Sequence, residues 1–179
     1  MSFSTLHRIF LIIVLLGGIT IGSYQPSKAS SNNSFDSLNS VIRAAEDDTS
    51  VARAYVELSE KLFRLYPDTV ISLCNKALSI VEDAMATANK EEAMALQLTK
   101  ARALNTIGLS YYKQGELDTA HEYYLECLEI FNEQEDKDGI AAGYHNIGSI
   151  FKTRGDIKSA LENYHHALYI CQETGFIQG

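Results

Sequence analysis

Cysteine and histidine are the side chains here best able to bind a metal or act as nucleophiles, so their spacing comes first. The sequence holds three cysteines, Cys74, Cys127 and Cys171. A structural zinc site needs closely spaced pairs such as Cys-x-x-Cys, and the sequence has none. The odd count and wide spacing also give no sign of a disulfide framework. We therefore predict that all three cysteines are buried, apolar core residues.

The histidines do not converge in the sequence either. His165 and His166 are adjacent on an expected helix, so their side chains point about 100° apart. Glu162 lies three residues before His165, the spacing of one half of a carboxylate-bridged di-metal site, but the other half is absent from the sequence. No Ser-His-Asp arrangement and no phosphate-binding glycine loop stands out. The sequence therefore predicts no catalytic residue, no metal and no cofactor.

Most of these cysteines and histidines lie in a unit that occurs twice in the sequence. Residues 101–139 and 141–179, aligned at a constant offset of 40, match at 11 of 39 positions without a gap. A repeat of this length cannot bury its apolar side alone, so its copies must stack. The matches are Ala101/Ala141, Ile107/Ile147, Gly108/Gly148, Gly115/Gly155, Ala120/Ala160, Glu122/Glu162, Tyr124/Tyr164, Leu128/Leu168, Ile130/Ile170, Glu133/Glu173 and Gly139/Gly179.

Each unit has the spacing of two helices. Leu104, Ile107, Gly108 and Tyr111 recur at intervals of three and four, which places them on one helix face. A second set with the same spacing begins after Gly115, a residue that can take the left-handed conformation that ends a helix. Because no alternating strand pattern occurs, we predict an all-α fold of stacked antiparallel helix pairs.

Small residues interrupt the otherwise bulky faces of these helices. Two helices that cross closely leave no room for a large side chain at the contact, and a tyrosine can fill the space beside it. The residues expected at these contacts are Gly108, Ala120, Tyr124, Gly148, Ala160 and Tyr164.

The repeats resemble the tetratricopeptide repeat family in its long, 40-residue variant, as found in exported bacterial regulators. The family's closing proline is replaced by Asn132 and Gln172. The resemblance implies a right-handed α-α superhelix whose first helices line a concave groove for a protein or peptide. It rests on Leu104, Ile107, Gly108, Tyr111, Ala120, Tyr124 and Cys127, and on Tyr144, Ile147, Gly148, Phe151, Ala160, Tyr164 and Ala167.

Residues of the first helices that core packing leaves over are candidates for contacting such a partner. They mix aromatic, amide and cationic groups that can hydrogen-bond a peptide backbone or a carboxylate. Leu109 and His145 stand where the family's carboxylate clamp has Asn and Lys, so we do not expect that kind of clamp. The predicted partner-binding residues are Arg102, Asn105, Tyr112, Lys113, His145, Ser149 and Lys152.

Residues 1–29 have the pattern of an export signal. Arg8 precedes an apolar run at residues 9–16, and Ser27-Lys28-Ala29 offers small residues at a cleavage site. The run fades through residues 17–22, and its total of about 14 residues is shorter than the roughly 20 of a spanning helix. We predict a cleaved signal, with an uncleaved N-terminal anchor as the alternative. Either places the rest of the chain in the periplasm or cell envelope if the source is bacterial.

The remaining chain divides into a leader and a repeat domain. Residues 30–48 are expected to form a polar leader and a short helix, and residues 49–179 the repeats, at about 49–83, 101–139 and 141–179. The first pair is divergent, with Ser59 and Cys74 in the places of Gly108 and Tyr124. About ten extra residues follow it, around 85–94, and their composition favours longer helices.

Charge and the final helix bear on partners. From residue 30 onward, without Arg8 and Lys28, the chain has 13 basic and 23 acidic residues, a formal charge of −10, so we do not expect nucleic-acid binding.

The helix expected at residues 156–173 would leave Leu161, Leu168 and Ile170 partly exposed. We expect further sequence to cover them, or else a partner or a homodimer mate.

Two functional hypotheses follow. The first is a non-enzymatic interaction module, an exported scaffold or sensor segment at the N-terminus of a longer bacterial membrane-associated signalling protein. Membrane attachment would then come from the N-terminus or from a later segment. The alternative is a self-contained periplasmic assembly factor that resembles a chaperone.

Overall fold

The computed structural model describes residue 40, residues 47–63 and residues 67–175. The predicted export signal, most of the predicted leader and Gly179 therefore lie outside the described residues. Among the helices that are described, none combines the length and the hydropathy that a membrane span requires.

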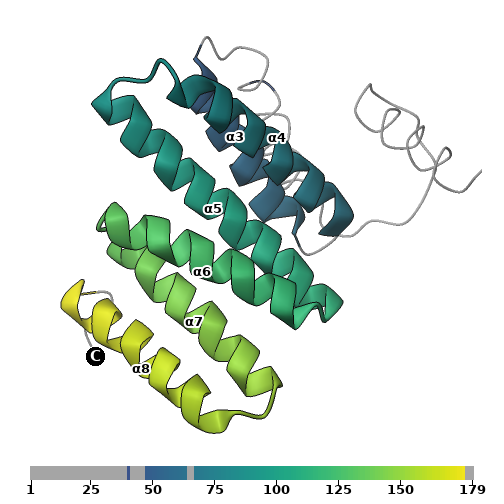
Figure 1. Cartoon of the computed structure of the whole chain (residues 1–179), viewed down its shortest axis with the longest axis vertical. Coiled ribbons are helices and arrows are strands. Elements are labelled where there is room, and N and C mark those ends of the chain that lie inside the picture. The colour runs from purple at the N-terminus through teal and green to yellow at the C-terminus, as the bar shows by residue number, and fades with distance from the viewer. Residues whose placement is uncertain (1–39, 41–46, 64–66, 176–179) are drawn as a thin grey trace, which may run out of the picture. The chain divides into compact units, whose positions relative to one another are not determined.

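Helix pairs make up the described part of the chain, which contains no strand (Figure 1). The helices are α3 (Asp48–Leu62), α4 (Pro67–Met85), α5 (Lys90–Gln114), α6 (Leu117–Glu133), α7 (Lys137–Thr153) and α8 (Ile157–Glu173). Each odd-numbered helix packs against the helix that follows it, and α5 and α7 also pack against both helices of the preceding pair. The predicted all-α stack of helix pairs is confirmed.

Short turns with specific backbone conformations join the helices. Gly115 ends α5 with φ at 83°, and Gly155 repeats this conformation after α7 with φ at 80°. These are left-handed values that glycine adopts without steric cost. Asp156 is the N-cap of α8, because its carboxylate accepts a hydrogen bond from the amide of Ser159 at 3.1 Å. The turn before α7 instead uses Glu135, a residue other than glycine with a positive φ of 54°.

Helix α5 is the longest and begins well before Ala101. Asn89 caps it by accepting hydrogen bonds from the amides of Glu91 and Glu92, and the Glu92 carboxylate accepts one from the Asn89 amide. This reciprocal capping box satisfies amides that have no partner inside the helix. Of the extra residues around 85–94, residues 90–94 lengthen α5 as their composition predicted, while residues 86–89 form the turn before it.

A glycine and a tyrosine form the close contact within the second and third pairs. A Cβ atom on Gly108 would lie 2.7 Å from Cε1 of Tyr124, and one on Gly148 would lie 2.9 Å from Cδ1 of Tyr164. Both glycines are buried. The predicted contact between small residues and tyrosines is therefore confirmed, and the ring occupies the space that a side chain on the opposite helix would need.

The first pair solves the same packing problem with two medium-sized residues. Ser59 and Cys74 are both fully buried, and the Cys74 thiol donates to Ser59 Oγ at 3.1 Å. Ser59 in turn donates to the carbonyl of Val56 at 2.6 Å. A larger residue in the place of glycine is thus matched by a smaller one in the place of tyrosine.

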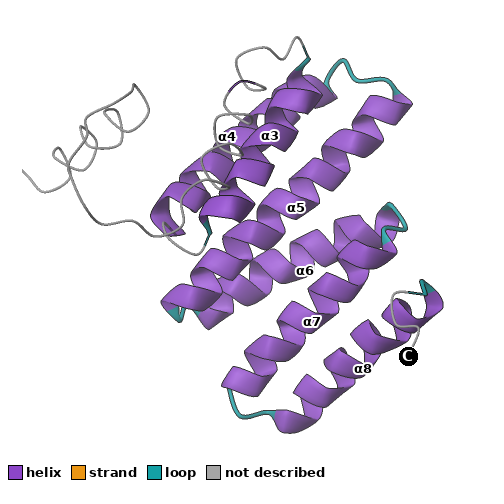
Figure 2. Cartoon of the chain, turned by 180° about the vertical axis from the view of Figure 1, so that it is seen from behind, coloured by secondary structure: helices purple, strands orange, loops and turns teal. Residues whose placement is uncertain are grey.

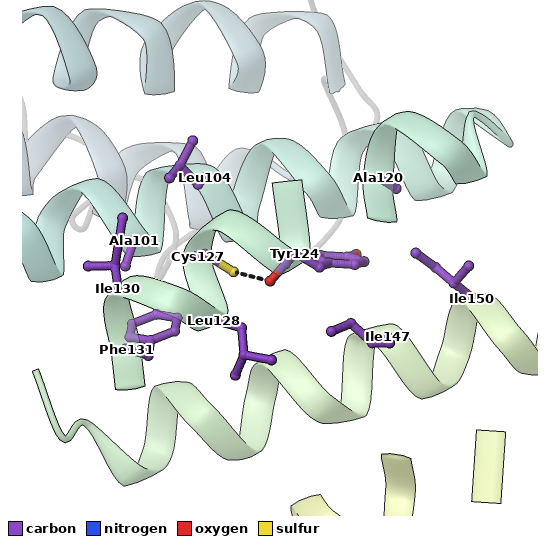
Figure 3. Close-up of a cluster of buried hydrophobic side chains, with 10 residues drawn as sticks. All are labelled: Ala101, Leu104, Ala120, Tyr124, Cys127, Leu128, Ile130, Phe131, Ile147 and Ile150. Carbon is purple, nitrogen blue, oxygen red and sulfur yellow. Dashed lines mark hydrogen bonds between the residues drawn. The ribbon is translucent and has the colours of Figure 1, made fainter. Parts of the chain in front are cut away.

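Two hydrophobic clusters hold the pairs together. The first gathers α5, α6 and α7 around Tyr124, Leu128 and Phe131 (Figure 3), where the Cys127 thiol also donates to the Tyr124 carbonyl at 3.3 Å. The second joins α3, α4 and α5 around Val56 and Val70. Helix α5 contributes buried residues to both clusters.

The glycine contact predicts a large effect of substitution. Gly148→Leu should destabilise the fold by more than about 1–3 kcal/mol, because the new side chain must displace the Tyr164 ring or separate the helices. Chemical denaturation followed by circular dichroism would measure the change. Ala142→Leu, at an exposed position of the same helix, is the matched control and should change stability by less than about 0.5 kcal/mol. Equal effects of the two variants would contradict the packing argument.

Candidate functional site

Two of the predicted partner-binding residues in α5 contact α3 or the residue after it. Arg102 Nη2 lies 2.9 Å from Oε2 of Glu60, and both oxygens of that carboxylate accept from it. Lys113 Nζ donates to the carbonyl of Phe63 at 3.5 Å and lies 4.2 Å from the centre of its ring. These cations are already engaged between the first and second pairs.

Two further predicted residues of α5 contact α7. Asn105 Oδ1 accepts a hydrogen bond from Asn146 Nδ2 at 2.8 Å, and the Tyr112 hydroxyl lies 2.8 Å from Thr153 Oγ1. The predicted residues of α5 therefore join neighbouring helices to one another. Their role in binding a partner stays a prediction.

The three predicted residues of α7 lie at or beside an open groove of about 810 Å³ between α7 and α8. His145 and Lys152 line it, and Ser149 Oγ lies 3.2 Å from the Tyr164 hydroxyl, which belongs to its wall. The His145 ring lies against the ring of Tyr164 with centroids 5.4 Å apart. The groove is lined by Asp138, Ala141, Ala142, His145, Lys152, Tyr164, Ala167, Leu168 and Cys171.

An apolar strip of α8 forms one side of this groove and continues beyond it. Leu168 is 42 % exposed and Leu161 is 52 % exposed, whereas Leu128, the counterpart of Leu168 in α6, is only 8 % exposed beneath α7. Within the described residues α8 packs against α7 alone, at the edge of the stack in both views (Figures 1 and 2). The expected exposure of Leu161 and Leu168, and the partial exposure of Ile170, are confirmed.

The prediction that all three cysteines are buried is wrong for Cys171. It is partly exposed and lines the groove, although its counterpart Phe131 is buried against α7. The physical reason is that no described helix covers α8 as α7 covers α6.

Asp138 and Ala142 also line the groove, although neither is among the predicted partner-binding residues. Leu98, the counterpart of Asp138, packs against the cluster that α7 covers, and this position could have identified Asp138. Arg102, the counterpart of Ala142, pairs with Glu60 of α3 and gives no such signal.

The buried cysteines have thiols that stay protonated at neutral pH. Burial raises the pKa of Cys74 to about 11 and that of Cys127 to about 12. A thiolate is the reactive form of cysteine, so these two side chains are poor nucleophiles. In the described part of the chain, no group of three or more potential metal-ligating side chains comes together.

Thiol labelling would distinguish the three cysteines. In the folded protein at pH 7–8, a thiol-reactive reagent such as Ellman's reagent should modify Cys171 alone, because Cys74 and Cys127 are buried and protonated. All three should react after denaturation. The Cys171→Ser variant should show no fast-reacting thiol, and a fast reaction that persists in this variant would contradict the burial of the other two.

Comparison with known proteins agrees with this architecture. A sequence model of the tetratricopeptide repeat family matches residues 99–173. The crystal structure of the apo form of RapI is similar, with a TM-score of 0.62 and 18 % sequence identity. The similarity covers 81 % of this chain and 40 % of the RapI chain, so this chain spans two fifths of that protein's length and shares its fold. No curated protein sequence matches the chain.

Proposed function

We propose that this chain, whose residues 99–173 match the tetratricopeptide repeat family, is a non-enzymatic module that binds another protein through the groove between α7 and α8. The observation that carries the proposal is the exposure of Leu168, which is 42 % where its counterpart Leu128 is 8 %. Proteins place contiguous exposed apolar surface where they bind other molecules.

The chemistry of the groove supports a protein ligand. Ala141, Ala167 and Leu168 provide an apolar floor, while His145 and Lys152 provide polar groups at its margin. An apolar centre with a polar rim is the usual anatomy of a protein interface. Repeats of this family generally bind proteins or peptides and act as scaffolds, which agrees with a binding role that requires no catalysis.

The proposed setting is outside the cytoplasm. The apolar run at residues 9–16, with Arg8 before it and small residues at 27–29, supports export to the periplasm or cell envelope. We further propose that the module is a scaffold or sensor segment of a longer, membrane-associated signalling protein. The net negative charge supports a protein as the partner in preference to nucleic acid.

A leucine substitution in the groove would test the binding proposal. Immobilised Leu168→Asp protein should lose a partner that the unchanged chain retains from an extract of the cells that produce it, because a charge replaces apolar contact surface. Quantitative mass spectrometry would measure the retained proteins. Leu125→Asp on α6, where the leucine is 49 % exposed outside the groove, is the matched control and should retain the partner. Retention of every protein by both variants would contradict the proposal.

A reporter fusion would test export independently. Residues 1–29 joined to alkaline phosphatase, which folds to an active form only in an oxidising compartment, should yield active enzyme in a bacterial host. The same fusion with Ile13 and Val14 changed to Asp should be inactive, because charges interrupt the apolar run. Equal activity of the two fusions would argue against an export signal.

A further inference from the structure

We propose that the groove between α7 and α8 binds an α-helix of a partner protein, and that this helix is acidic at its C-terminal end. This inference rests on the proposed function, in which the same groove is the binding site. It adds the secondary structure and the charge of the ligand.

The preceding pair shows how such a groove binds a helix. Helix α7 lies against both α5 and α6. A Cβ atom on Gly143 would lie 3.0 Å from Cδ1 of Leu128, and one on Gly139 would overlap the Phe131 ring. The N-terminal half of α7 therefore presents bare backbone to the apolar side chains of α6.

The C-terminal end of α7 is held there by polar contacts. Thr153 Oγ1 lies 2.8 Å from the hydroxyl of Tyr112 in α5, and Arg154, just past the end of α7, forms an ion pair with Asp118 in α6. These two contacts define which groove residues face the last turn of a bound helix.

The residues 40 positions later in the sequence occupy the equivalent places in the open groove. Leu168 stands in the place of Leu128, and Tyr164 in the place of Tyr124. The structure supports this equivalence, because Gly148 contacts Tyr164 as Gly108 contacts Tyr124. A helix bound between α7 and α8 would thus lie across the exposed Leu168, as α7 lies across Leu128.

The polar positions of the groove differ in charge between the two repeats. Lys152 stands in the place of Tyr112, and Lys158 in the place of Asp118. The Lys158 side chain is 87 % exposed, and its ion pair within the described residues is a long one of 3.9 Å to Glu162. Where the earlier groove pairs an acid with Arg154, the open groove offers two lysines, so the matching positions of the bound helix should be acidic.

Asp138 agrees with an acidic C-terminal end if the bound helix runs in the same direction as α7. It lies in the first turn of α7, at the opposite end of the groove from Lys152, and stands in the place of the apolar Leu98. In that direction an acidic N-terminal end would meet this carboxylate, so the acidic residues belong at the C-terminal end. Cys171 stands in the place of Phe131 and is smaller, so a residue larger than glycine can take the place of Gly139.

The same charges disfavour the first helices of a second copy of this chain as the occupant. The first helices of the three pairs carry basic residues in their last turns, namely Lys61 in α3, Lys113 in α5 and Lys152 in α7. Any of them placed in the open groove would bring a cation toward Lys152 and Lys158. Such like-charge contacts select against these helices as partners. The second helices have no basic residue in their last turns, so self-association through one of them is an outcome that the test below must distinguish.

Two synthetic helices would test the proposal against the full chain. The basic peptide has the sequence of residues 137–154, and the acidic peptide is the same with Glu in place of Thr153 and Arg154. A hydrocarbon staple across the positions of Asp138 and Ala142, which face away from α6, would keep both helical, because isolated helices of this length are marginal in water. Fluorescence anisotropy would measure binding.

We expect the acidic peptide to bind about fivefold more tightly than the basic one, which corresponds to the upper range for an exposed ion pair. Lys158→Glu should reverse this preference, whereas Lys90→Glu, an identical charge change at the start of α5, should leave it intact. Leu168→Asp should weaken both peptides. Equal binding of the two peptides, unaffected by Lys158→Glu, would overturn the charge assignment but leave the groove as a helix-binding site.

Other outcomes separate this inference from the function on which it rests. If neither peptide binds, the assignment of a helical ligand is overturned, whereas the proposed function is decided by whether Leu168→Asp loses a retained partner. Analytical ultracentrifugation covers the remaining case. A dimer of the unchanged chain that Leu168→Asp converts to monomer would show that a second copy occupies the groove, and would overturn the assignment to another protein.

Discussion

The close contact between the two helices of each pair is the constraint on which the rest of the structure depends. In two pairs a glycine lies against a tyrosine ring, and in the remaining pair Ser59 lies against Cys74. The sizes are complementary in every case, since protein interiors tolerate neither overlap nor voids. Because this contact sets how closely the helices approach, it also sets the angle at which each pair presents its outer surface to the next.

The outer surfaces of the α5–α6 pair and of the α7–α8 pair differ in whether another described helix covers them. Between α5 and α6 the surface is filled by α7, and Leu128 and Phe131 are buried. Between α7 and α8 the same geometry is open, with Leu168 exposed. In a stack of repeats each pair contacts only its neighbours. The open groove therefore has the same kind of lining as the surface that α7 covers one repeat earlier.

The sequence was sufficient to predict the helices and the contacts that repeat. Spacing of three and four identified the buried faces, and the offset of 40 identified Gly108 and Gly148 as equivalent. It could not predict the pairs between Arg102 and Glu60 or between Asn105 and Asn146, because these depend on how long side chains meet across neighbouring helices. Cys171 was assigned to the core because the repeat pattern assumes that every helix has neighbours on both sides.

Helix α5 couples the two hydrophobic clusters, because it contributes buried residues to both. Leu96 and Ile107 pack toward the first pair, while Ala101 and Leu104 pack toward α6 and α7. A single rigid rod thus forms part of two cores, and neither core can melt without disturbing the other. The array from α3 to α7 should behave as one cooperative unit, in contrast to long solenoids that unravel from their ends. Helix α8 buries only Ala160 and Ala167 among its residues, so hydrogen exchange would begin there.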